Sequence, residues 1–159
     1  MSISYTNYLN LICEQLKAII IAEFPRFGAK NRLLFKKLNI VDLSGEDVIF
    51  ITPSLDNLEY EDTGGRTSTY IVELYYLRKI YPSDDYKLLT DVAEHIKALF
   101  YAENYRHNHD YWHYCAVTSI DYNLELPELT HHCGHFHELQ ENKNYYGFKV
   151  TLEIHNSQY

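Results

Sequence analysis

The stretch from Leu58 to Ile80 constrains the fold most, because it reads as one hairpin with a long second strand. Nearly every residue from Thr67 to Leu77 favours β-structure. Alternation along this strand predicts one face with Tyr70, Val72, Leu74 and Tyr76 and another with Glu73 and Lys79. The Gly64-Gly65 pair supplies the positive φ angles of a tight reversal. We therefore expect the acidic segment before the glycines to fold back along the strand as its antiparallel partner.

Two amphipathic helices are expected beside this hairpin. The first, Ser4 to Glu23, has Ser4 or Thr6 as its N-cap, and Pro25 with Gly28 closes it. Its apolar stripe consists of Tyr5, Leu9, Ile12, Leu16, Ile19 and Ile20. The second helix runs from about Asp85 to Ala102, after a break at Pro82 and a cap at Ser83 or Asp84, and we expect it on the same sheet. Its apolar face consists of Leu89, Val92, Ile96, Leu99 and Phe100.

The remaining strands complete one antiparallel sheet. Leu38 to Leu43 and Val48 to Thr52 read as strands around a turn at Ser44 to Asp47, the second strand ending at Pro53. Leu33, Leu34 and Leu38 are equally compatible with a short helix. A later strand is expected over Tyr111 to Leu126, with one side made up of Trp112, Tyr114, Ala116, Thr118, Ile120 and Tyr122. The last strand is expected over Asn144 to His155, with one side made up of Tyr146, Phe148, Val150, Leu152 and Ile154. The pattern is that of an α+β fold, a central mostly antiparallel sheet flanked by two main helices, in a single domain spanning residues 1–159.

Composition narrows the functional classes. A net charge of −8 disfavours gripping nucleic acid, since most free nucleic-acid-binding domains are basic. Three widely spaced cysteines do not suggest a disulfide framework and favour synthesis in a reducing cytoplasm. The apolar run from Ala18 to Ala22 is too short to span a membrane and follows no basic leader.

Charge is segregated along the chain. Arg26 to Lys37 holds only basic charges, among them Arg26, Lys30 and Arg32, whereas Asp42 to Asp62 holds only acidic ones. Such segregation sets up complementary patches on neighbouring copies in a ring, and a solvated basic face explains it equally well.

Histidines tempt a metal interpretation, because seven of the nine lie between His107 and His137. The densest group offers zinc-type ligands in one short loop: His131, His132, Cys133, His135 and His137. Zinc sites usually draw paired ligands from two separated elements, so we favour a polar loop with adventitious affinity and predict no metal. One equivalent of bound metal per untagged chain would overturn that interpretation.

Catalytic signatures are missing from the sequence. The adjacent letters of His107-Asn108-His109 do not make the dispersed nuclease motif of similar name, and the segment from Thr63 to Arg66 lacks the lysine of a phosphate-binding loop. No nucleophile motif surrounds a serine or cysteine. We therefore predict a non-enzyme with no catalytic residues and no cofactor.

The order of elements resembles that of the small tail-terminator or tail-completion proteins of long-tailed bacteriophages. The resemblance lies in the order of the elements and in the pattern of residue types along them. It is clearest over Arg66 to Leu74 and over Tyr146 to Ile154, a strand that opens with the aromatic pair Tyr145-Tyr146. It implies a structural virion protein that caps the tail tube as a homo-oligomeric ring, expected to be sixfold, and joins it to the head or neck. The loop rich in histidine departs from the family pattern.

The resemblance also implies partners and a place. The subunit would contact the tail tube protein and head or neck connector proteins at the tail-neck junction of the virion, after synthesis in the host cytoplasm. An acidic lumen would let DNA pass without sequence-specific binding, and no membrane is involved. Expected interface residues are Glu61, Asp62, Thr63, Gly64, Gly65 and Arg66 at the hairpin tip and the basic Arg26, Lys30 and Arg32. Alternatives are another neck or baseplate structural protein, and a small metal-dependent enzyme that uses the His-rich loop.

Overall fold

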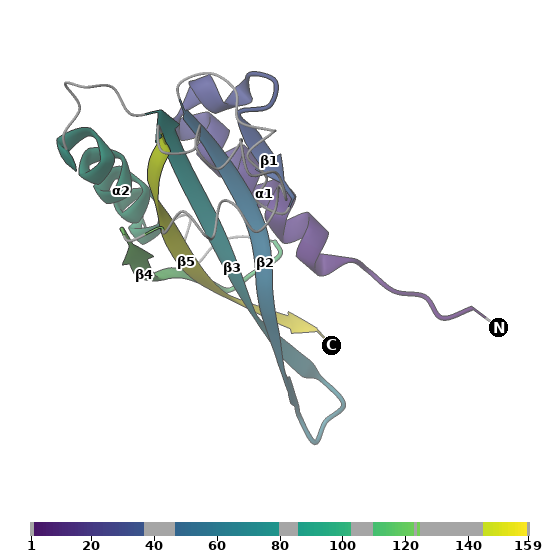
Figure 1. Ribbon diagram of the computed structural model, residues 1–159. Coiled ribbons are helices and arrows are strands. Elements are labelled where there is room, and N and C mark those ends of the chain that lie inside the picture. The colour runs from purple at the N-terminus through teal and green to yellow at the C-terminus, as the bar shows by residue number, and fades with distance from the viewer. Residues whose placement is uncertain are drawn as a thin grey trace, which may run out of the picture.

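One five-stranded sheet organises the computed structural model, which describes residues 2–36, 47–79, 86–102, 110–122, 124 and 145–158. The strands lie in the order β1-β2-β3-β5-β4 (Figure 1). Only β1 and β2 run parallel, and the other neighbours are antiparallel. The strands are β1 (Leu33–Phe35), β2 (Asp47–Tyr60), β3 (Arg66–Lys79), β4 (Tyr114–Asp121) and β5 (Tyr145–Gln158). The expected α+β class, with a mostly antiparallel sheet and an extended hairpin, is confirmed.

Both helices pack on the same face of the sheet. Helices α1 (Tyr8–Glu23) and α2 (Tyr86–Tyr101) share one hydrophobic cluster with the inward side chains of the strands. The buried residues of α1 are Ile12, Cys13, Leu16, Ile19 and Ile20, and those of α2 are Leu89, Ala93, Ile96, Leu99 and Phe100. The short 3-10 helix η1 (Pro25–Gly28) follows α1 and adds Phe27 to this core. The expected position of the second helix on the same sheet as the first is therefore confirmed.

The two central strands follow the predicted alternation. On β3 the residues Tyr70, Val72, Leu74 and Tyr76 are buried, and on β5 so are Phe148, Val150, Leu152 and Ile154. Tyr76 stacks on Phe148 with ring centroids 4.9 Å apart. Gly147 permits the close strand approach here, because a Cβ at that position would lie 1.9 Å from the carbonyl oxygen of Tyr76. Burial of these apolar side chains drives the pairing.

The first helix starts later than the sequence predicted. It begins at Tyr8, and the cap is Asn7, whose side chain accepts a hydrogen bond of 3.1 Å from the backbone N–H of Asn10. Ser4 and Thr6 do not cap it. Tyr5 precedes the helix and is exposed, so its place in the apolar stripe was wrong. A short amide side chain three residues before a free N–H outcompetes the more distant hydroxyls.

The strand predicted to end at Pro53 instead continues to Tyr60. A β-bulge between Pro53 and Leu55 lets the strand continue past the proline. Proline has no N–H to donate, and it is tolerated in a sheet at a bulge or on an edge strand. The predicted strand and the acidic arm of the hairpin are thus one strand, β2. Leu33 and Leu34 lie on β1, so the alternative of a short helix there was wrong.

Of the strand predicted over Tyr111 to Leu126, the described residues show only β4. A register shift between Val117 and Ser119 changes which side chains face inward. Cys115 is buried before the shift, while Ile120 and Tyr122 pack on the core after it. Strict alternation from Tyr114 through Thr118 to Tyr122 was therefore wrong, because one extra residue reverses the faces.

Several sequence predictions fall outside the described residues. These are the strand over Leu38 to Leu43, the turn that follows it, the caps Ser83 and Asp84, the His107-Asn108-His109 group and the loop with His131, His132, Cys133, His135 and His137.

Candidate interaction surface

The hairpin of β2 and β3 extends well past the helices, and we call its outer part, residues 53–72, the arm (Figure 1). Every residue of β2 from 53 to 60 is exposed. The pairing runs to Tyr60 opposite Arg66, and β5 accompanies β3 as far as Gln158 opposite Arg66. Within the described residues β2 pairs with β1 only at Ile49 to Ile51, so its outer half forms an edge of the sheet.

A tight turn closes the arm. The backbone N–H of Glu61 donates to the carbonyl of Gly65 over 2.8 Å, and that of Gly64 donates to the carbonyl of Glu61 over 3.0 Å. Gly64 has φ +90°, a conformation that favours glycine. The sequence predicted positive φ for both glycines, but of the two only Gly64 has it, and Gly65 is buried. The acidic Glu61 and Asp62 stay exposed at the tip.

A polar network joins the arm to β5. Arg66 Nε donates to Gln158 Oε1 over 2.7 Å, and Gln158 Nε2 donates to Asn156 Oδ1 over 2.7 Å. Asn156 Nδ2 in turn donates to the carbonyl oxygen of Tyr111 over 2.6 Å. Because Asn156 is buried, its amide needs these partners. Arg66, which was expected at an interface, therefore also stabilises the arm of its own subunit through its hydrogen bond to β5.

Exposed apolar side chains follow the arm. Leu58 and Tyr60 pair with Ser68 and Arg66, which places them on the helix-bearing face, beyond the cover of the helices. Their exposed fractions are 47% and 73%. Leu55, 54% exposed, pairs with Ile71 and lies on the opposite face. Leu58 and Tyr60, two large apolar side chains exposed on the same face of this edge, indicate a binding surface there.

An open recess of about 430 Å³ separates the arm from the residues that precede α1. It is lined by Ser4, Tyr5, Thr6, Tyr8, Tyr60, Gly64, Arg66 and Gln158. The tyrosines combine apolar rings with wet hydroxyls, a chemistry that is common at protein interfaces.

The predicted basic residues Arg26 and Arg32 converge on a buried carboxylate. Arg26 Nε donates to Asp47 Oδ2 over 3.0 Å, and Arg32 forms an ion pair with Asp47 Oδ1. The Tyr76 hydroxyl donates to Asp47 Oδ2 over 2.9 Å. Burial, and then the neighbouring carboxylate, raise the pKa of Tyr76, so this hydroxyl remains a donor.

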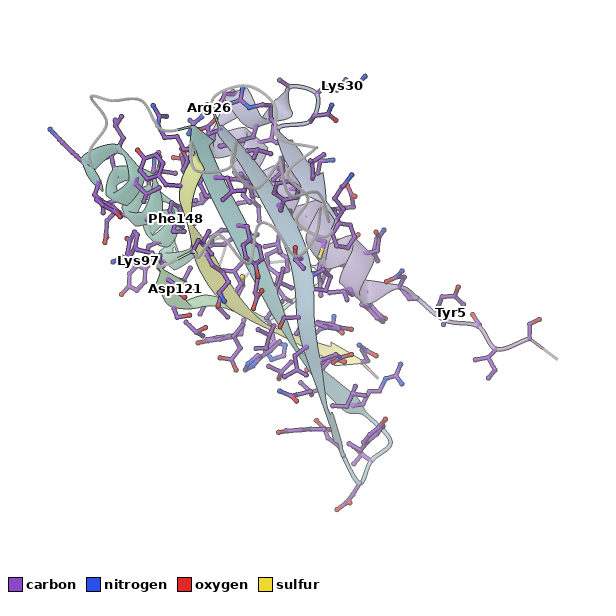
Figure 2. The ribbon with its side chains drawn as sticks, in the orientation of Figure 1. Tyr5, Arg26, Lys30, Lys97, Asp121 and Phe148 are labelled. Carbon is purple, nitrogen blue, oxygen red and sulfur yellow. The ribbon has the colours of Figure 1, made fainter. Side chains whose placement is uncertain are left out.

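This arrangement gives both arginines a structural task. Arg32 is 17% exposed and Arg26 42%, and the Arg26 guanidinium lies 4.6 Å from the ring centroid of Phe27. Lys30 is exposed, and Figure 2 shows it with Arg26 at the end of the molecule opposite the arm tip. The interface role of these three residues stays a prediction.

The nine predicted interface residues thus form two separate groups, one at each end of the described structure. Sequence reasoning missed Asp47, which it placed in a turn, and it missed the exposure of Leu58 and Tyr60. The exposure of Leu58 and Tyr60 could have been predicted from their alternate positions on a strand that continues beyond the helices.

Other site chemistry is limited in the part of the chain that the structure describes. No group of three or more potential metal-ligating His, Cys, Asp or Glu side chains occurs there. His113 is exposed, with its ring 5.9 Å from that of His155. None of the helices in this part is long and apolar enough to cross a membrane.

Comparison with known proteins finds no matching family model and no matching curated protein.

Proposed function

We propose that the protein is a structural virion component that caps a phage tail tube as an oligomeric ring and joins it to the head or neck. The observation that carries the proposal is the arm, a long, exposed, edge-forming hairpin whose tip bears Glu61 and Asp62. Its outer strand, residues 53–60, is exposed throughout, adds nothing to the core of its own subunit and is placed to reach a neighbour or the tube. The α+β layout matches what the resemblance to tail terminators implies.

Charge placement supports a head-to-tail contact between copies. Asp56, Glu59, Glu61 and Asp62 lie on the arm, and Lys30 lies at the other end of the molecule (Figure 2). Contact of one copy's acidic arm with the next copy's basic end is heterologous, and a heterologous contact closes into a ring when the rotation permits. Opposite charges then select this pairing over arm-to-arm contact.

An acidic ring suits the passage of DNA. The chain carries a net charge of −8, which repels phosphate backbones along the lumen. The ring would sit at the tail-neck junction, between the tube protein and the connector proteins, as a passive conduit without catalysis.

Shortening the arm tip tests the proposal. Deletion of Gly64 and Gly65 removes the turn that closes the hairpin but leaves the core intact, so the free energy of unfolding should fall by no more than about 2 kcal/mol. Phage lacking the wild-type gene and supplied with this variant should yield unjoined heads and tails by electron microscopy. Glu14→Gln, on the exposed side of α1 and outside both predicted interface groups, is the control and should give intact particles. Normal particles from the deletion variant would contradict the role of the arm.

A further inference from the structure

We infer that residues 2–6 of one copy add as a β-strand to the outer edge of the arm in a second copy. The outer edge is the side of β2 over residues 54–60 that faces away from β3. The inference rests on the proposed function only in taking a second copy of the chain as the partner.

The acceptor is a sheet edge without a partner among the described residues. Over residues 54–60 β2 pairs with β3 on one side alone, so every second residue turns its N–H and C=O outward. Pro53, which has no N–H, marks the inner limit of this edge. Exposed N–H and C=O groups in a row are the template on which an added strand forms.

The donor is a segment with strand character that lies outside its own sheet. Residues 2–6 read Ser-Ile-Ser-Tyr-Thr, with Ile3 87% and Tyr5 85% exposed. In Figure 1 the segment before α1 runs outward and does not lie along β2. Two large apolar side chains at alternate positions, both exposed to water, indicate a segment that can form a strand and bury these side chains against a partner.

Donor and acceptor match in spacing. Ile3 and Tyr5 are two residues apart and share one face of a strand, as do Leu58 and Tyr60 on the helix-bearing face of the arm. Pairing the segment with β2 places Ile3 and Tyr5 beside Leu58 and Tyr60. Ser4 then lies on the opposite face of the sheet. Cross-strand pairs of apolar and aromatic side chains stabilise a sheet.

Charge selects this donor over another copy of β2. The outer edge carries Asp56 and Glu59, so two such edges side by side would repel each other. Residues 2–6 carry no charge and meet the acidic edge without repulsion. The edge is thus protected from indiscriminate pairing and remains open to an uncharged strand.

Paired variants test the inference on the full-length protein. Ile3→Ser with Tyr5→Ser spoils the donor, Leu58→Ser spoils the acceptor, and Leu55→Ser is the matched control on the opposite face of the same strand. Oligomer mass is measured by size-exclusion chromatography with light scattering. Donor and acceptor variants should each associate at least tenfold more weakly than wild type, whereas Leu55→Ser should associate normally.

Mixing the variants gives the decisive result. The donor variant keeps an intact edge and the acceptor variant keeps an intact segment, so a mixture should form heterodimers that neither variant forms alone. Backbone amides of residues 54–60 should also exchange hydrogen more slowly in assembled wild type than in the dilute protein.

Other outcomes overturn the inference. Unchanged assembly of both variants would refute strand donation while leaving the ring of the proposed function intact. Slow amide exchange in a monomer would show the segment on its own arm, which also refutes donation between copies. Exchanged dimers that never close into a ring would support donation and contradict the proposed function.

Discussion

Asp47 organises the basic end of the molecule at the scale of single residues. Its carboxylate is buried and accepts from Arg26, Arg32 and Tyr76, so three segments distant in sequence meet at one group. Sequence alone predicted the two arginines as free interface charges, because an ion pair across 15 and 21 residues leaves no local pattern. A buried charge is tolerated only with such partners, which explains why they converge.

Asp47→Ala should be strongly destabilising. Removal of the carboxylate leaves the Tyr76 hydroxyl without its acceptor and leaves the Arg32 guanidinium only its bond from Nε to the backbone carbonyl of residue 47, so the free energy of unfolding should fall by about 3–5 kcal/mol. Tyr76→Phe removes one hydrogen bond and should lower it by about 1 kcal/mol. Urea denaturation of both variants measures the difference. Equal, small effects would mean that the cluster contributes little to folding.

Cys13 and Cys115 should be unreactive in the folded protein. Burial raises the pKa of each thiol from 9.0 to about 12, so at pH 8 each carries roughly a thousandfold less thiolate than an unfolded cysteine. A Cys133→Ser variant isolates these two thiols, and a colorimetric thiol reagent measures their rate before and after denaturation. Rapid modification of the native protein would contradict their burial.

The raised pKa of these two thiols also makes the stability of the protein depend on pH. Because the pKa of each thiol is higher in the folded than in the unfolded protein, their contribution to the free energy of unfolding is fully present below about pH 9 and is lost as the pH rises toward 12.

At the scale of elements, long regular patterns were predicted well and irregularities were not. The alternation of β3 and β5 and the stripe of α2 follow from burial on one face, which the residue order records directly. The bulges at Pro53 and after Val117 do not, because a bulge changes register without a residue type that requires it. The residue at which α1 starts depends on which of three polar residues caps the helix, and an N-cap side chain contributes about 1 kcal/mol to helix stability.

The cap of α1 is testable on its own. Asn7→Ala should lower the free energy of unfolding by about 1 kcal/mol, since the N–H of Asn10 loses its acceptor. Ser4→Ala and Thr6→Ala, at the positions first expected to cap, should stay within about 0.5 kcal/mol of wild type. Thermal denaturation of the three variants compares them. A larger effect from Ser4→Ala would restore the longer helix.

At the scale of the whole molecule, the described structure has two unlike ends. An acidic arm with an apolar edge lies at one end and Lys30 lies at the other (Figure 2). The sequence predicted the hairpin that reverses at Gly64 and Gly65, and the interface role of its tip stays a prediction. It did not reveal the edge of β2 or the recess beside Tyr5, because both depend on where the helices stop covering the sheet. Unlike ends on one chain favour head-to-tail assembly over a two-fold dimer.

The assembly state of the untagged full-length protein tests this account most directly. Native mass spectrometry, with negative-stain microscopy of the same sample, should show one closed ring whose mass is a whole multiple of the 18.9 kDa subunit, with six copies expected from the family resemblance. A monomer at every concentration would contradict the account.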